Sequence, residues 1–170
     1  AQLALLPDES VLFVAHGFQH ATLGHFPLGI LHPGSGRITG IPVTPLPAGT
    51  PNAMAVDAVG RTAYVGWFDS PSVGSSSVYA VALPHGGAPT LVAVLAGDIL
   101  QLAVEESGTI VAGTSGSPGL LRIDPATLAV THAHPTLGCC NAIEIERATG
   151  DIFALSGCPA PGAYRVTPSG

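Results

Sequence analysis

The sequence PNAMAVDAVGRTAYVGW (residues 51–67) carries the pattern that decides the fold. An alternating apolar run leads into a short turn at Asp57 to Gly60, and a second run with aromatic and β-branched residues follows the turn. This arrangement predicts a β-hairpin. The hairpin pattern recurs at Gln2 to Gly17, Leu100 to Ser115 and Cys140 to Gly157, with Leu5, Val56, Val104 and Ile145 in register.

The spacing of these four hairpins predicts a β-propeller. They recur at intervals of about 40 to 50 residues, which is typical of propeller blades built from four antiparallel strands. The blades fall approximately at residues 1–48, 49–97, 98–139 and 140–170 of a single domain, and the last repeat ends after its third strand. We therefore expect an all-β chain of about four blades with an incomplete last blade. It is either an open fragment of a larger propeller or a small ring, and the cut inside a blade favours the fragment.

The composition supports an all-β fold and argues against two classes of partner. Of the 170 residues, 46% are hydrophobic and only 9% are charged, and the 22 glycines and 16 prolines indicate frequent turns. The net charge is −6 and the five cations are scattered arginines, which disfavours a nucleic acid partner. Pro, Gly or Asp interrupts every apolar run before the ~20 residues that a membrane span requires.

The stretch Pro51 to Asp57, together with Gly60 and Tyr64-Val65, resembles the blade pattern of the NHL and gluconolactonase-like six-bladed propellers. In enzymes of that type, side-chain oxygens at the starts of inner strands point toward a divalent cation in the central channel. The resemblance therefore implies that Asn52 and Asn141 are candidate Ca²⁺ ligands. The alternative, which we prefer, is that each Asn forms a local Asx turn. The acidic base of such enzymes has no counterpart here, because Glu9 lies in a turn on the opposite face.

Two histidine clusters are further candidates for a metal site. His16, His20 and His25 share one connection, and the pair His132 and His134 precedes two cysteines, Cys139 and Cys140. Imidazole and thiolate are ligands of zinc and copper when their geometry converges. Neither cluster has a recognised ligand spacing, so uncharged surface histidines are the simpler interpretation.

Propeller topology predicts where a functional site lies. The connections between the second and third strands of each blade, and those between blades, all emerge at one end of the blades. We call this the loop-rich end. Aromatic residues, which are common interface anchors, gather there and are candidate partner contacts; they are Phe18, Phe26, Trp67 and Phe68. Alternatively, these rings cover the blade tops.

The three cysteines predict one disulfide bond. Counting outward from the turn of the last hairpin, with Glu146 opposite Asp151, places Cys139 opposite Cys158 at a separation that a disulfide can bridge. A slip of one residue would substitute Cys140 for Cys139, and a bond between Cys139 and Cys140 is a third option. The disulfide implies an oxidising compartment, whereas three reduced cysteines would indicate a cytosolic protein.

The sequence supports neither a catalytic nucleophile nor nucleotide binding. Gly113 to Gly119 is better interpreted as a flexible loop than as a nucleophile elbow, and no glycine-rich turn precedes a helix that could hold phosphate. We expect a non-catalytic extracellular module that acts in binding or structural assembly through its loop-rich end, without a cofactor other than the candidate Ca²⁺. Its partner would be a protein or a further segment of the same protein that completes the propeller. The alternative is a metal-dependent lactonase or hydrolase of the gluconolactonase-like type.

Overall fold

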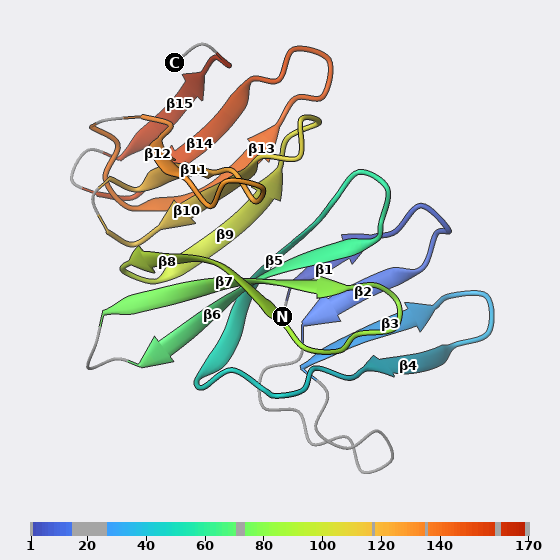
Figure 1. Ribbon diagram of the computed structural model, residues 1–170. Helices are drawn as coiled ribbons and strands as arrows, with labels where there is room; N and C mark the ends of the chain where they lie inside the picture. The colour runs from blue at the N-terminus through green and yellow to red at the C-terminus, as the bar shows by residue number, and fades with distance from the viewer. Residues whose placement is uncertain are drawn as a thin grey trace.

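The computed structural model describes residues 2–14, 27–70, 74–116, 118–134, 136–158 and 161–168 (Figure 1). The described residues form fifteen strands in four antiparallel sheets, and they contain no helix. Blade 1 contains β1 (Leu3–Leu5), β2 (Val11–Val14), β3 (Leu28–His32) and β4 (Arg37–Ile41). Blade 2 contains β5 (Thr50–Val56), β6 (Thr62–Ser70), β7 (Ser75–Ala82) and β8 (Thr90–Ala96). Blade 3 contains β9 (Ile99–Val104), β10 (Ile110–Thr114), β11 (Leu120–Ile123) and β12 (Val130–His132). Blade 4 contains β13 (Cys140–Ile145), β14 (Ile152–Ser156) and β15 (Gly162–Val166).

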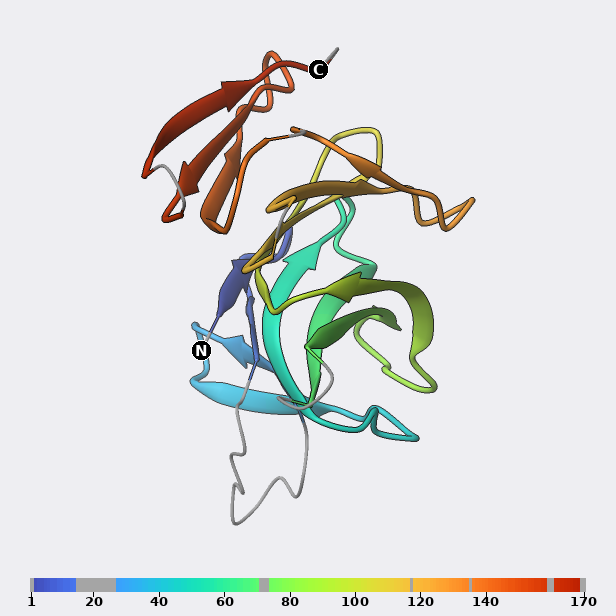
Figure 2. The same ribbon diagram turned by 90° about the vertical axis from the view of Figure 1, so that its left-hand side faces the viewer.

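The fold is an incomplete β-propeller, which confirms the fold class predicted from the sequence. Within every blade the strands pair with their neighbours in chain order, and blade 4 has three strands where the others have four. Figures 1 and 2 show the sheets following one another from the blue N-terminal blade to the red C-terminal blade. Blades 1 and 4 therefore lie at the two ends of the row.

The core consists of three apolar layers, one at each junction between consecutive blades. Alternation along each strand sends every second side chain to one face of its sheet, so a central blade contributes to two layers. In β6, for example, Ala63, Val65 and Trp67 pack toward blade 1, whereas Tyr64 packs toward blade 3. The third layer joins blades 3 and 4 through residues such as Val111 and Ile152.

Two glutamines tie neighbouring blades together. In blade 1 the Gln2 side chain accepts a hydrogen bond from the Met54 backbone N–H at 2.6 Å and donates one to the Leu100 carbonyl at 3.2 Å. In blade 3 the Gln101 side chain binds the backbone of Ile143 in blade 4. Gln2 and Gln101 occupy the same position of the repeat, where blades 2 and 4 have alanine. Blades with this glutamine (1 and 3) therefore alternate along the chain with blades that have alanine in its place (2 and 4).

A β-bulge recurs at the start of the inner strands. One residue is inserted into the ladder between the first and second strands of blades 2, 3 and 4. These inserted residues are Asn52, Leu100 and Asn141, which are equivalent positions of the repeat. A bulge bends its strand and redirects a side chain. The three bulges therefore set the side-chain directions at the loop-rich end.

Candidate functional site at the loop-rich end

Hydrogen bonds join the described connections between blades at the loop-rich end to neighbouring loops. The connection between blades 2 and 3 is bound on both sides, because Gly97 N–H donates to the Gly74 carbonyl at 2.7 Å and Ser115 N–H donates to the Asp98 carbonyl at 2.8 Å. The Ser115 hydroxyl in turn accepts from Asp98 N–H at 2.8 Å. In the next connection, the Leu137 carbonyl accepts from Gly119 N–H at 2.7 Å. These contacts hold the described loops against the blades.

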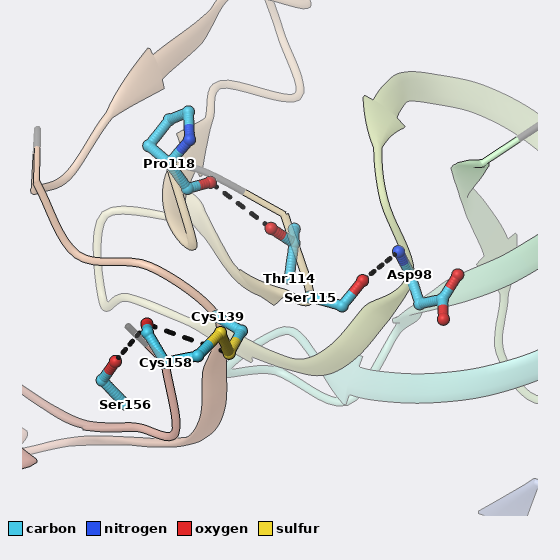
Figure 3. The surroundings of a disulfide bond; sticks show 7 residues. All are labelled: Asp98, Thr114, Ser115, Pro118, Cys139, Ser156 and Cys158. Atoms are coloured by element: carbon cyan, nitrogen blue, oxygen red, sulfur yellow. Dashed lines mark hydrogen bonds between the residues drawn. A yellow bond between two sulfur atoms is a disulfide. The ribbon is translucent and has the colours of Figure 1, made fainter. Parts of the chain in front are cut away.

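A disulfide bond between Cys139 and Cys158 closes this end of blade 4 (Figure 3). It is the pair that counting across the hairpin predicts, and its Cα atoms are 5.4 Å apart. The local register differs from the counted one by one residue, because the bulge at Asn141 places Cys140 opposite Ser156. The carbonyl of Cys139 consequently accepts from the N–H of Gly157 at 3.0 Å.

Cys140, the alternative partner in our prediction, is not part of the disulfide. Its side chain is fully buried in the layer between blades 3 and 4. The thiol lies 3.5 Å from the Ala142 carbonyl. Burial raises the pKa of this thiol to about 11, because the charged thiolate is disfavoured away from water. Cys140 is therefore a core residue and a poor nucleophile.

Asn52 and Asn141 stand at bulges of the inner strands, and the described residues around them include no cluster of acidic side chains. The Asn52 Oδ1 atom is buried and has no hydrogen-bond partner among the described residues, so the Asx turn that we preferred at this position does not form. Asn141 is exposed, and its side chain lies against Gly157. The equivalent position in blade 3 is Leu100, which offers no ligand. Calcium requires six to eight oxygen ligands, usually including carboxylates. No group of three or more His, Cys, Asp or Glu side chains with the arrangement of a metal site occurs in the described ranges.

The histidine clusters do not assemble into a metal site where they can be described. His16, His20 and His25 lie outside the described residues. His132 is exposed on β12, whereas His134 is half-buried with its ring 6.0 Å from that of Tyr164. Of the two cysteines nearby, Cys139 forms the disulfide and Cys140 is buried in the core.

The structure also corrects the predicted aromatic contacts. Trp67 is 1% exposed and packs edge-to-face on Tyr79, with ring centroids 6.2 Å apart. It is thus a core residue between blades 1 and 2 and not a surface anchor. The alternation from Ala63 through Val65 to Trp67 was the sequence signal for this placement. Phe68 is half-buried at the loop-rich end, and Phe18 and Phe26 lie outside the described residues.

Sequence reasoning missed a second candidate surface on blade 4. Residues of blade 4 and Gln101 of blade 3 line a groove of about 570 Å³, whose lining includes the aromatic and aliphatic side chains of Phe153 and Leu155 and the charged side chains of Glu144 and Arg165. The side chains of Phe153 and Leu155 are exposed. Phe153 is equivalent in the repeat to Tyr64 of blade 2, which packs in the layer between blades 2 and 3. This alignment is the sequence signal that could have drawn attention to Phe153.

Comparison with solved structures finds the same fold in proteins of distant sequence. A gluconolactonase from Xanthomonas campestris has a TM-score of 0.72 at 17% identity, over 97% of this chain and 55% of that chain. Hydrazine synthase from Kuenenia stuttgartiensis has a TM-score of 0.71 at 14% identity, over 98% of this chain and 45% of that chain. The extracellular domain described for a hybrid two-component system from Bacteroides thetaiotaomicron has a TM-score of 0.66 at 16% identity, over 96% of this chain and 21% of that chain.

These similarities establish the fold and no activity. The resemblance to gluconolactonase-like propellers is confirmed at the level of the fold, and such a fold serves many functions. The chain spans about half or less of the solved chains it matches here. No protein-family model and no curated protein matches the sequence. In the described part of the chain, no helix has the length and apolar character that crossing a membrane requires.

Proposed function

We propose that this chain is a non-catalytic extracellular β-propeller module that binds a protein partner through its loop-rich end. The disulfide between Cys139 and Cys158 is the observation that carries the proposal. Disulfides persist in oxidising compartments and are rare in the cytosol. The likeness to an extracellular domain of a two-component system is consistent with that location.

The architecture of the loop-rich end suits binding. The described connections at this end are held by backbone hydrogen bonds, and the buried Ser76 hydroxyl accepts a further one from Ile99 N–H at 3.3 Å. A surface that is ordered before binding loses less conformational entropy when a partner docks. Asn141 and Ser115 are exposed on this surface and offer polar contacts, while Phe68 offers an apolar one.

Site-specific photo-cross-linking tests this proposal. A photoreactive side chain replaces Asn141 or Ser115, and a control chain carries it at the exposed Val59, in a turn at the opposite end of blade 2. We expect both loop-end variants, applied to the extracellular face of cells that make the protein, to yield the same discrete protein adduct. The control should not yield it. Equal labelling from all three positions, or no adduct from the loop-rich end, would contradict the proposal.

A metal-dependent lactonase is the second candidate function. One observation favours it: the buried Asn52 oxygen lacks a hydrogen-bond partner in a fold shared with a gluconolactonase. The scarcity of acidic ligands counts against it. Calorimetric titration with Ca²⁺ separates the two candidates, because the binding module should release no binding heat, whereas a lactonase should bind Ca²⁺ and lose that binding in Asn52→Leu.

A further inference from the structure

The outer edge of blade 2 is a strand that lacks charge and proline, two devices that usually protect an edge. β8 is the last strand of its sheet and, within the described residues, pairs only with β7. It has seven residues, whereas the outer strands of blades 1 and 3, β4 and β12, have five and three. Natural edge strands are usually short or carry charged residues or proline, because their free backbone groups can pair with another chain. β8 is long and contains neither.

A β-bulge in the middle of β8 turns two aliphatic side chains to the same face of the sheet. Leu91 pairs with Tyr79 of β7. Val94 pairs with Ser77, and the register shift between the two pairs leaves Val92 without a partner on β7. Because Ser77 and Tyr79 are two positions apart on β7, their partners share one face. Leu91 is 47% exposed and Val94 is 60% exposed. The edge therefore combines free backbone groups with an exposed aliphatic pair.

The sequence around β8 carries no charge that would oppose a second copy. The net charge of the chain is −6, so contact between two copies generally brings like charges together. From Ser70 to Gly97 the sequence contains no Asp, Glu, Lys or Arg, and this range includes β7, β8 and the turn between them. Depletion of charged residues is typical of the core of a protein interface. Two copies can therefore meet at this edge without like charges facing each other.

β8 is complementary to a second copy of itself in antiparallel orientation. Such a pair is symmetric about one position, and residues directly opposite each other lie on the same face of the joined sheet. When the bulge is the central position, Leu91 of one copy lies opposite Val94 of the other, and Thr90 lies opposite Leu95. Leu91 and Val94 share one face, whereas Thr90 and Leu95 share the other. The faces thus match on both sides of the bulge.

We propose that β8 pairs antiparallel with β8 of a second copy of this chain, so that the two four-stranded sheets of blade 2 join into one. Both copies use the same edge, so the assembly closes as a twofold-symmetric dimer. Backbone hydrogen bonds and the two Leu91–Val94 pairs stabilise the contact. This edge is separate from the side chains proposed to bind a partner at the loop-rich end, and the inference does not rest on that function.

A lysine on the edge tests where the contact lies. Val94→Lys introduces a charge into β8, and Val130→Lys, at an exposed valine of the outer strand β12, is the matched control. Both valines are exposed, so neither change should prevent folding, which circular dichroism and thermal unfolding verify. Analytical ultracentrifugation measures dimerisation from micromolar to millimolar concentration. We expect the wild type and the Val130 variant to dimerise, and Val94→Lys to weaken dimerisation about tenfold or more.

Cysteine cross-linking tests the register in chains that keep the edge uncharged. Leu91→Cys and Val94→Cys are made separately, and each variant and their mixture are oxidised mildly. Cys140 is buried and should not compete. Only unlike variants place their new thiols directly opposite each other, so the mixture should form disulfide-linked dimers about tenfold faster than either variant alone.

Three outcomes would overturn the inference. A wild type that stays monomeric over the whole concentration range would do so, and would leave an extended segment of another protein as the occupant of the edge. Unchanged dimerisation of Val94→Lys would place the contact on another surface. Equal rates of cross-linking in the mixture and in the single variants would exclude antiparallel pairing about the bulge.

Discussion

Gln101 and Ile143 exchange two hydrogen bonds across the junction of blades 3 and 4. The Gln101 Nε2 atom donates to the Ile143 carbonyl at 2.9 Å, and the Ile143 N–H donates to Oε1 at 3.1 Å. Ile143 is buried, so these backbone groups have little access to water. One side chain thus satisfies both polar groups of a residue in the next blade.

Gln101→Ala should lower the free energy of unfolding by about 1–3 kcal/mol, the cost of leaving a buried donor or acceptor without a partner. Urea unfolding measures the change. Gln101→Glu is the matched comparison, because it keeps an acceptor for the Ile143 N–H but turns the donor into a charged oxygen that faces the Ile143 carbonyl. It should cost at least as much as the alanine variant, because a half-buried carboxylate oxygen without a donor is unfavourable. Equal stability of wild type and Gln101→Ala would show that water replaces the glutamine at this junction.

Loss of the disulfide should lower stability by about 3 kcal/mol in the chain-entropy model, because the bond closes a loop between cysteines 19 residues apart. The double variant Cys139→Ser/Cys158→Ser and the reduced wild type should unfold at the same lower urea concentration. Reductant should have no further effect on the double variant. A wild type whose unfolding midpoint is insensitive to reductant would contradict this prediction.

The Cys140 thiol should react very slowly in the folded protein. With a pKa of about 11, roughly one thiol in a thousand is ionised at pH 8, and the side chain is buried as well. Alkylation should be slow at pH 8 and complete within the same time in denaturant. Above pH 9 the unfolded chain ionises this thiol and the folded chain does not, so its contribution to stability is lost as pH rises toward 11. In Cys139→Ser, the exposed Cys158 serves as a rapidly labelled control.

Trp67→Ala should cost about 3–5 kcal/mol, the range for removing a large buried aromatic side chain. Phe68→Ala is the neighbouring control and should cost clearly less, because Phe68 is only half-buried. Trp67 is the sole tryptophan, so its fluorescence reports on the layer between blades 1 and 2. Emission should be blue-shifted in the folded protein and move to longer wavelength on unfolding. Emission typical of an exposed indole in the folded protein would contradict the burial.

The strand pattern could be predicted from the sequence because its signals are local. Alternation and turn residues such as Asp57 to Gly60 define each hairpin, and equivalent positions in four repeats support one another. The first two strands of every blade overlap the four hairpin stretches predicted from the sequence, and the last blade ends after its third strand, as the repeat predicts.

The candidate site was harder to predict because it depends on register and on packing between blades. The bulge at Asn141 shifts the ladder by one residue, and no local residue type announces it. The position of Trp67 near a strand end indicates the loop-rich end, whereas its alternation with Val65 indicates the core, where the structure places it. The importance of Phe153 could emerge only after Tyr64 was seen covered by blade 3.

The bulges at Asn52, Leu100 and Asn141 have a consequence for protein engineering. Each inserted residue lacks a partner in the strand ladder, so its side chain can be exchanged without breaking the pairing of the sheet. Because the same insertion occurs in three consecutive blades, these positions form a ready-made set of grafting points at the mouth of the propeller. Acidic side chains introduced at these three positions are a starting point for designing a cation site into the scaffold, whose natural sequence has leucine at the middle position.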